Sequence, residues 1–434
     1  MTTISSVRGF EALDSRGRPT VGCVVELAGG ARGRVVVPSG ASTGQYEAYE
    51  LRDGGPRYEG FGVLGAVRSV NEVLATAVTG LEAADQEQVD LAMEAADGTP
   101  TLAVLGGNAV LAVSLAVMIA DAQGAGCELW QRLSDSETPL LPMPMVNIFS
   151  GGAHAGHAID IQDVLVVPVG AASFAEAMEW VSRVRLASAV ILESRGGSAA
   201  LVADEGGLGG RLASNAEALS LVTEGIEAAG FVPGVDVGIA VDLAANQFWD
   251  GSHYVLRAEH LRLTPSDWLS VVAGWCEQFP IVSVEDVLSD DDWSGWREAS
   301  QSLGVGRQLL GDDLFATNAS RLRRAIDSAV GNAVLVKPNQ AGTVSRALAV
   351  VRMAQVNGYA TVVSARSGDT EDAWLADLAV GWRSGQIKVG STMRSERTAK
   401  WNRLLEIEAL DQGHTRFAGR GGLAGQTVDA PGTG

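Results

Sequence analysis

The sequence predicts an α/β protein that contains a modified (β/α)8 barrel preceded by an α+β capping domain. With 434 residues, of which 46% are apolar, the chain is long enough for a barrel with an added module. From about residue 140, short β-branched runs that end in polar residues alternate with helical stretches. The polar residues that end the later runs lie 22 to 43 positions apart, which suits one βα unit each.

The first part of the chain, residues 1–135, has a different pattern. Strand-like VGCVVEL and GRVVVPSG come before helical segments such as NAVLAVSLAVMIADAQ, and this order predicts the capping domain. Within it, residues 38–45 are rich in Gly and Ser and are expected to close over an anionic ligand. We expect the barrel to span residues 136–425. Residues 426–434, the end of the Gly-rich segment GRGGLAGQTVDAPGTG, are expected to form a flexible tail.

Composition and charge argue against several classes of protein. A net charge of −20 disfavours binding to nucleic acid or to an anionic membrane. Cys23, Cys127 and Cys276 are widely spaced and odd in number, which fits neither a disulfide framework nor a zinc site and indicates a reducing compartment. The sequence shows no signal segment and no apolar run of the roughly 18 residues that a membrane span needs, so we expect a cytoplasmic protein.

Lysine is rare in this chain. Of the 32 basic residues, only Lys337, Lys388 and Lys400 are lysines, and the rest are arginines. The pKa of a lysine can be lowered until it acts as a base, whereas arginine stays protonated. Lys337 and Lys388 each lie at the end of a predicted strand, which indicates a functional use. For Lys400, GC-rich coding explains the composition equally well.

A set of polar residues ends the predicted strands. In a barrel such residues lie together at the C-terminal mouth, where barrel enzymes have their active sites. One such residue alone is most often a solvated loop charge, but a complete set at barrel spacing indicates a cavity. The predicted set is Asp163, Glu205, Asp242, Glu285, Asp312, Lys337, Arg366 and Lys388.

Three carboxylates of this set, Asp242, Glu285 and Asp312, end successive predicted strands. Oxygen donors of this kind suit Mg²⁺, which takes few carboxylates and leaves positions for water and substrate. The positive charge of the ion disfavours a protonated lysine nearby. Lys337 or Lys388 can therefore be neutral enough to take a proton from carbon.

The remaining members of the set complete a reaction scheme. Glu205 is expected to be the acid on the opposite side, and Arg366 with Ser367 offers a fork for phosphate or carboxylate. Together these residues predict abstraction of a proton α to a carboxylate, metal stabilisation of the enediolate, and loss of a β-substituent.

These residues and their flanking segments resemble the enolase family over nearly the whole chain. The resemblance implies a capping domain, a modified barrel, one or two Mg²⁺ per subunit, a homodimer or larger homo-oligomer, and conversion of 2-phosphoglycerate to phosphoenolpyruvate and water. The matching segments are ALDSRGRPTV, VPSGASTG, LGGNAVLAVSLAV, PMPMVNIFSGGAHAG, ADEGG, VDLAANQF, VSVEDVLSDDDW, GDDLFATN, LVKPNQAGTVS, SARSGDTED and GQIKVGSTMRSERTAKWNRLLEIE.

Matched motif by motif, the resemblance implies metal ligands and catalytic residues. Lys337 resembles the base for the C2 proton, and Glu205 the acid that helps the C3 hydroxyl leave. His154 matches the family's lid histidine in GG-x-HAG. The first metal would be bound by three carboxylates and the second by a hydroxyl of the ASTG loop: Asp242, Glu285, Asp312 and Ser42.

Substrate contacts are implied in the same way. Lys388 resembles the contact to the substrate carboxylate, and Arg366 with Ser367 resembles the contact to phosphate. Gln162 and Asp163 stand where family members carry QEF. We therefore expect Gln162 to contact substrate and Asp163 to be a catalytic carboxylate that is shorter by one methylene.

The departures from the family's pattern gather at the phosphoryl and leaving-group end. Ala365 stands where family members have the histidine of SHRSG, and Ser150 replaces the asparagine of NGG. DEGG is followed by LGGR, and VEDV lacks the usual proline. Because the metal and base end matches the family, this pattern indicates that the substrate-binding space beside Ala365 has been refitted.

Three functions remain open. The leading hypothesis is an enolase-family enzyme refitted for a phosphonate substrate in antibiotic biosynthesis, similar to carboxyphosphonoenolpyruvate synthase, since a histidine replaced by Ala365 leaves room for a bulkier anionic head group. The second is a glycolytic enolase with tolerated substitutions. The third is a catalytically silent binding protein, which the retained Lys337, Glu205 and metal carboxylates disfavour.

Overall fold

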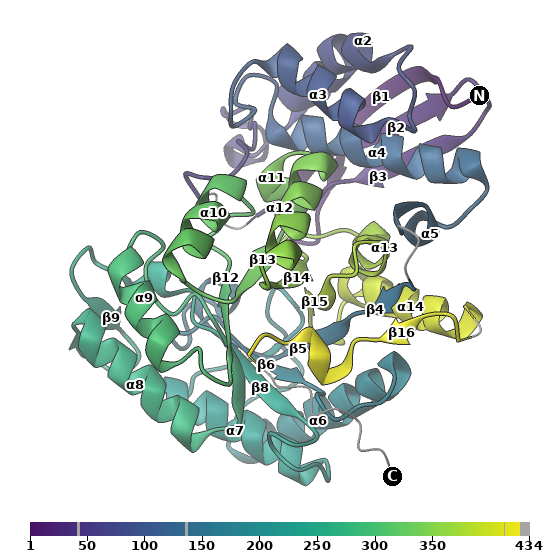
Figure 1. The fold of residues 1–434 in the computed structure, drawn as a ribbon. Coiled ribbons are helices and arrows are strands. Elements are labelled where there is room, and N and C mark those ends of the chain that lie inside the picture. Colours follow the sequence, from purple (N-terminus) through teal and green to yellow (C-terminus); the bar gives the residue numbers. More distant parts are fainter. Residues whose placement is uncertain (41–43, 135–137, 412, 426–434) are drawn as a thin grey trace.

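The computed structural model describes residues 1–40, 44–134, 138–411 and 413–425. In Figure 1 an N-terminal domain, coloured purple to blue, lies against a barrel that is coloured teal to yellow. The expected closing loop, residues 38–45, is only partly within the described residues. The expected tail, residues 426–434, lies outside them.

The N-terminal domain combines a small sheet with a layer of helices. Its strands β1 (Ile4–Leu13), β2 (Pro19–Leu27) and β3 (Arg32–Val36) pair antiparallel in that order. This is the α+β arrangement that the sequence predicts. The helices and helical turns that follow are η1 (Arg57–Gly60), α1 (Leu64–Arg68), η2 (Ser69–Leu74), α2 (Ala75–Val78), α3 (Gln86–Asp97), α4 (Gly107–Ala125) and α5 (Leu129–Leu133).

Helix α4 is the central helix of this domain and packs on β2 and β3. By length and composition it is apolar enough to cross a membrane, but 78% of its apolar window is buried inside the protein. Gly33 of β3 permits the close contact, because a Cβ atom there would lie 1.8 Å from the carbonyl oxygen of Ala116. The apolar surface of α4 is therefore used in the core of the domain.

Within the described residues, eight strands close into a barrel. Their order is β15-β14-β13-β12-β11-β8-β6-β5, and pairing of β15 with β5 closes the ring. Pairs are parallel except those that β6 makes with β5 and with β8. The strands are β5 (Met143–Ser150), β6 (Asp163–Val167), β8 (Gly238–Asp242), β11 (Ile281–Glu285), β12 (Gln308–Gly311), β13 (Ala333–Val336), β14 (Ala360–Ser364) and β15 (Gly385–Gly390).

Helices surround the barrel (Figure 1), and several begin where the sequence provides a capping side chain. Ser173, Ser214, Thr264 and Thr343 accept hydrogen bonds from backbone N–H groups in the first turn of the helix that follows each. The helices are α6 (Phe174–Ser194), α7 (Asn215–Ala228), α8 (Pro265–Gln278), α9 (Trp293–Ser302), α10 (Ala319–Ser328), α11 (Pro338–Ala341), α12 (Val344–Val356), α13 (Trp374–Gly381) and α14 (Ser395–Leu410).

The first two barrel strands differ from the predicted βα repeat. Strand β5 is followed by the antiparallel β6, and the turn η3 (Gly152–Ala155) lies between them in place of an outer helix. The prediction that Asp163 ends a strand is therefore wrong. Asp163 begins β6, and it lies at the same end of the barrel as Asp242 because β6 runs in the opposite direction.

The prediction that Glu205 ends a strand is also wrong. Glu205 lies in a turn that precedes the two-residue strand β7 (Leu208–Gly209). Gly206 has a positive φ of 83°, which turns the chain directly after Glu205 and stops the short apolar run from continuing as a strand. Glu205 is thus held by a loop, whereas Asp242 and Glu285 end strands as predicted.

Apolar side chains fill the barrel interior at the end opposite the mouth. Met143, Leu165 and Leu335 belong to a buried cluster that also contains Leu423 of the C-terminal segment. Beside it, the fully buried Gln308 and Gln386 exchange amide hydrogen bonds of 3.0 and 2.8 Å.

The remaining short elements are β4 (Leu140–Leu141), β9 (Tyr254–Leu256), β10 (Leu261–Leu263), β16 (Arg416–Phe417), η4 (Ala245–Phe248) and η5 (Gly419–Gly422).

The N-terminal domain is bound to the barrel through contacts of α3 and α4 with α11 and α12. The hydroxyl of Ser114 accepts a hydrogen bond from Val344 N at 3.0 Å. Nearer the barrel mouth, Ala48 N donates to the carbonyl oxygen of Gln340 at 2.8 Å. These contacts place the segment that follows the expected closing loop at the rim of the barrel.

We predict that Leu423→Ala lowers the free energy of unfolding by about 2 to 4 kcal/mol, because it removes a side chain from the buried barrel interior and leaves a cavity. Urea unfolding followed by tryptophan fluorescence measures the change. The matched control is Leu410→Ala at the end of α14. Leu410 is 71% exposed, and its truncation should change the free energy of unfolding by less than about 0.5 kcal/mol. Equal effects of the two substitutions would contradict the packing role of Leu423.

Candidate active site

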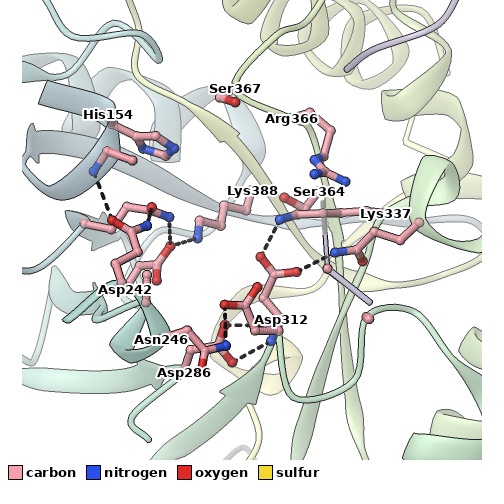
Figure 2. A pocket seen from close by; sticks show the side chains of 18 of the residues that line it. His154, Asp242, Asn246, Asp286, Asp312, Lys337, Ser364, Arg366, Ser367 and Lys388 are labelled. Carbon is pink, nitrogen blue, oxygen red and sulfur yellow. Dashed lines mark hydrogen bonds and ion pairs between the residues drawn. The ribbon is translucent and has the colours of Figure 1, made fainter. Parts of the chain in front are cut away.

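A cavity of about 510 Å³ lies at the mouth of the barrel and is bordered by Gly44, Tyr46 and Glu47 of the N-terminal domain. Glu285 and Asp163 are not among the described residues that line it, and Ser42 lies outside the described residues. Figure 2 shows the cavity from close by. The predicted site residues that line it are His154, Gln162, Glu205, Asp242, Asp312, Lys337, Ala365, Arg366, Ser367 and Lys388.

Lys388 connects two of the predicted metal ligands. Its Nζ lies 2.8 Å from Asp242 Oδ2 (Figure 2). The same atom lies 2.7 Å from Glu285 Oε2, and all three side chains are buried. Burial alone would lower the pKa of Lys388. The charges of Asp242 and Glu285 outweigh burial and hold this pKa well above its usual value. Lys388 is therefore a fixed positive charge between the two carboxylates.

Lys337 and Asp312 form a second ion pair in the cavity, between Lys337 Nζ and Asp312 Oδ2. The other oxygen of Asp312 accepts a hydrogen bond from Gln340 Nε2 at 3.0 Å. Burial raises the pKa of Asp312, but the charge and the hydrogen bond of Lys337 lower it by more. The pKa of Asp312 therefore lies below its usual value. Asp312 is thus held as a carboxylate, and the Lys337 side chain has a defined position.

The carboxylates at this end of the cavity fit a divalent cation. Oxygen atoms of Glu285, Asp286 and Asp312 lie within 4.8 Å of one another. Burial and the neighbouring carboxylates raise the pKa of Asp286 well above the usual range, so negative charge here is incompletely compensated. Since the donors are all oxygen atoms, the residues present suit Mg²⁺.

Sequence reasoning missed Asp286, the second acid of the segment VED. Its carboxylate accepts hydrogen bonds from the backbone N–H groups of Asp312 at 3.0 Å and Asp313 at 2.8 Å. Asp286 therefore fixes the loop that carries Asp312.

Gln162, expected to contact substrate, lines the cavity, and its Nε2 donates to Asp242 Oδ2 at 3.0 Å. It thus orients one of the predicted metal ligands.

Arg366 and Ser367 lie in Figure 2 on the side of the cavity away from Asp242, Asp286 and Asp312. Arg366 Nη1 is 3.2 Å from Glu47 Oε2 and 3.1 Å from Asn339 Oδ1. The fully buried Arg397 donates to the backbone carbonyl oxygens of Arg366 and Ser367 at 2.6 and 2.7 Å. Sequence reasoning missed Glu47 and Asn339, although Asn339 lies within the segment LVKPNQAGTVS and Glu47 lies two residues after the expected closing loop.

Ala365 contributes only a methyl group beside this pair. Its backbone N–H donates to the carbonyl oxygen of Lys388 at 2.9 Å, and its side chain lines the cavity next to that of Ser364. The Ser364 hydroxyl donates to the carbonyl oxygen of Ala365 at 3.0 Å. This part of the cavity wall is therefore formed by two small side chains that carry no charge.

His154 lies between two carboxylates. Its Nδ1 donates to Asp163 Oδ2 at 2.8 Å, and its Nε2 is 3.8 Å from Glu205 Oε1. Burial alone would lower the pKa of His154, but the charges of Asp163 and Glu205 outweigh burial and raise it to about 9. Ligand atoms of the three residues lie within 4.8 Å of one another. We assign no metal to them, because the two ring nitrogens face different carboxylates.

Comparison with protein-family models gives two matches that together cover almost the whole chain. Residues 4–133 match the model described as the enolase N-terminal domain. Residues 138–424 match the model described as the enolase C-terminal TIM barrel domain. The second match contains the strands whose ends form the cavity.

We predict that the folded protein becomes less stable as the pH rises from about 6.5 to 9, because the stabilisation that comes from protonated His154 is lost in this interval. The pKa of the folded state is about 9 and the usual value is 6.5, so in this interval the folded state keeps a proton that the unfolded chain has lost. The contribution, at most about 3 kcal/mol, is fully present below pH 6.5 and is lost above pH 9.

Urea unfolding at several pH values between 6 and 10 measures this effect. The variant His154→Gln should lose the decline, whereas the control His414→Gln, at an exposed position, should keep it. An identical pH dependence in the wild type and in His154→Gln would contradict the prediction.

Proposed function

Since the chain belongs to the enolase family, we propose that it is a Mg²⁺-dependent enzyme that removes the proton α to the carboxylate of a small phosphorylated or phosphonate acid. The observation that carries the proposal is that Lys337, Glu205, Asp312 and Arg366 line one cavity. A base, an acid, a cation site and an anion site are the groups that this reaction requires. In this proposal a capping domain, residues 1–135, and a barrel, residues 136–425, form the site together.

Lys337 is the proposed base. It follows β13 directly, and Asp312 holds its Nζ at the cavity surface. The neutral amine takes the C2 proton of the substrate and becomes an ammonium group that Asp312 stabilises. Lysine can give up its proton in the next turnover, which arginine cannot do at this position.

The metal-binding residues are proposed to be Asp242, Glu285 and Asp312, with Ser42 as ligand of a second ion. Bound Mg²⁺ supplies positive charge that stabilises the enediolate and disfavours a further positive charge on a nearby lysine. Glu285 and Asp312 are buried and have oxygen atoms within 4.8 Å of each other, which supports their part of this proposal; the third member of that cluster is Asp286 and not Asp242. Lys388, which pairs with Asp242 and Glu285, is proposed to contact the substrate carboxylate.

Glu205 is the proposed acid that donates a proton to the leaving group. His154, whose Nε2 lies 3.8 Å from Glu205 Oε1, places positive charge next to it. Both residues line the cavity. Asp163, expected to be catalytic, is 1% exposed and contacts His154, so a direct contact with substrate is disfavoured.

Arg366 and Ser367 are proposed to bind the anionic group of the substrate, with Gln162 contributing from the Asp242 side. The side chains of Ser364 and Ala365 beside them are small, which supports the proposal that the substrate has a head group bulkier than a phosphate ester. We therefore infer a phosphonate substrate and a role in phosphonate antibiotic biosynthesis, similar to that of carboxyphosphonoenolpyruvate synthase.

A glycolytic enolase is the second candidate, because the base, the acid and the metal carboxylates are all present at one cavity. A direct assay for water loss from 2-phosphoglycerate separates the two. Turnover of about 10 per second or more would favour the glycolytic reaction. Absence of Mg²⁺-dependent binding of any enolpyruvyl or phosphonate ligand would favour a catalytically silent binding protein.

Enolase-family enzymes commonly assemble into oligomers. We propose a cytoplasmic homodimer or larger homo-oligomer with one or two Mg²⁺ per subunit. The net charge of −20 supports the expectation that neither nucleic acid nor an anionic membrane is a partner.

We predict that Lys337→Ala slows exchange of the C2 proton of 2-phosphoglycerate by at least about 1000-fold, because no other group is proposed to take this proton. Proton NMR in D₂O measures the loss of the C2–H signal. The control Lys337→Arg keeps the positive charge beside Asp312 but cannot become neutral, and it should lose exchange to a similar extent. Exchange at the wild-type rate in either variant would refute the assignment of the base.

We predict that Ala365→His weakens binding of phosphonoformate, a phosphonate with a carboxyl group on phosphorus, by about tenfold, because the imidazole fills the space beside Arg366. Isothermal titration calorimetry in the presence of Mg²⁺ measures the affinity. The same variant should lose water from 2-phosphoglycerate faster than the wild type. The control Ala103→His, at an exposed position outside the cavity, should change neither quantity. Unchanged affinity in Ala365→His would contradict the refitted pocket.

A further inference from the structure

The buried carboxylate of Asp163 makes its contacts inside the protein. Asp163 is 1% exposed and is not among the described residues that line the cavity. Its Oδ1 accepts hydrogen bonds from Ser150 Oγ at 2.8 Å and from Asn147 Nδ2. Its Oδ2 accepts the hydrogen bond from His154 Nδ1. Both oxygens are therefore engaged by side chains of the chain itself.

The groups that hold Asp163 are rigidly placed. Ser150 lies directly opposite Asp163 in the antiparallel register of β5 and β6, and Asn147 lies three residues earlier on β5. Both side chains are fully buried, and Asn147 Nδ2 also donates to Ser150 Oγ at 3.0 Å. Two paired strands thus fix the carboxylate, which is a more precise support than a loop provides.

His154 connects this carboxylate to the cavity. It lies in the turn η3, and its carbonyl oxygen accepts a hydrogen bond from Asp204 N at 3.3 Å, which ties η3 to the turn that carries Glu205. With Nδ1 bound to Asp163, Nε2 faces Glu205. A buried carboxylate that orients an imidazole toward a reacting group is the arrangement that sets ring orientation and tautomer in catalytic triads.

We propose that Asp163 is a positioning residue that acts through His154: it orients the ring so that a protonated Nε2 faces Glu205 and the cavity, while Ser150 and Asn147 hold Asp163 in place. Ser150 and Asp163 are both departures from the family's pattern, and they are in direct contact. They therefore act as one unit, in which the shorter acid is turned toward the hairpin and away from the substrate.

The first test needs no substrate. The chain has five histidines, so ¹⁵N-histidine labelling of the full-length protein gives few ring signals, and His154→Gln identifies those of His154. At pH 7.5 the wild type should show protons on both ring nitrogens of His154. Asp163→Asn should convert the ring to the neutral form. The control Asp160→Asn removes another buried carboxylate of the same segment, one held by backbone N–H groups of residues 257 and 258, and should leave the signals unchanged.

The second test uses turnover and rests on the proposed function, in which Glu205 is the acid. Asp163→Asn should lower kcat by about 10-fold to 100-fold, since misplacement of the ring affects the step at Glu205, and should change KM by less than about threefold. Asp163→Glu keeps the charge and should retain the protonated ring. Asp163→Ser, a smaller side chain, serves in place of Asp163→Asn if that variant does not fold, with the same expected loss.

The outcomes separate this inference from the proposed function. If the His154 ring signals of Asp163→Asn equal those of the wild type, Asp163 does not position His154 and the inference is overturned. A rise in KM with kcat unchanged would also overturn it, because it would place Asp163 in substrate binding. If the ring signals respond as expected but no acid is turned over by the wild type, the proposed function fails and the positioning role stands.

Discussion

Buried negative charge at the barrel mouth is the constraint on which the rest of the structure depends. Asp242, Glu285 and Asp312 come from three neighbouring strands and are buried, and like charges that are buried close together repel strongly. The chain compensates them with ammonium groups, Lys388 from β15 and Lys337 from the end of β13. Positive charge cannot reach these carboxylates from the opposite end of the barrel, because apolar side chains fill that end. The closed ring of strands keeps these charges at short distances, which makes the site attractive to a small cation.

The fold could be predicted because each parallel strand leaves a strong local signal, an apolar run that ends in a polar residue. Asp242 and Glu285 were placed correctly for this reason. Asp163 was predicted at the correct end of the barrel and Glu205 at the cavity, but neither ends a strand. An apolar run in the sequence shows neither the direction of a strand nor whether the run pairs with another strand. Asp286 was missed because its carboxylate binds the backbone N–H groups of Asp312 and Asp313, which are distant in sequence. The spacing of polar residues along the chain does not reveal contacts to backbone groups.

Each of the three lysines has a defined partner in the structure. Lys400, the third lysine, is buried, lies 2.7 Å from Asp369 Oδ1, and also donates to the carbonyl oxygens of Thr370 and Glu396. It holds the loop after β14 together with Arg397 of the same helix. All three lysines are thus paired with buried carboxylates. The sequence singled out Lys337 and Lys388 and left the use of Lys400 open; the structure shows that Lys400 supports a loop and that the other two line the cavity.

The β5–β6 hairpin has a consequence for how such a scaffold changes over evolutionary time. Most barrel strands are followed by an outer helix, so a change at their ends must also be compatible with helix packing. Between β5 and β6 the chain forms only a turn, and His154 reaches the cavity from that turn. Ser150 and Asp163 are not among the described residues that line the cavity, so substitutions there act on it through His154. A change at these two positions can therefore alter the cavity wall without altering a residue of an outer helix.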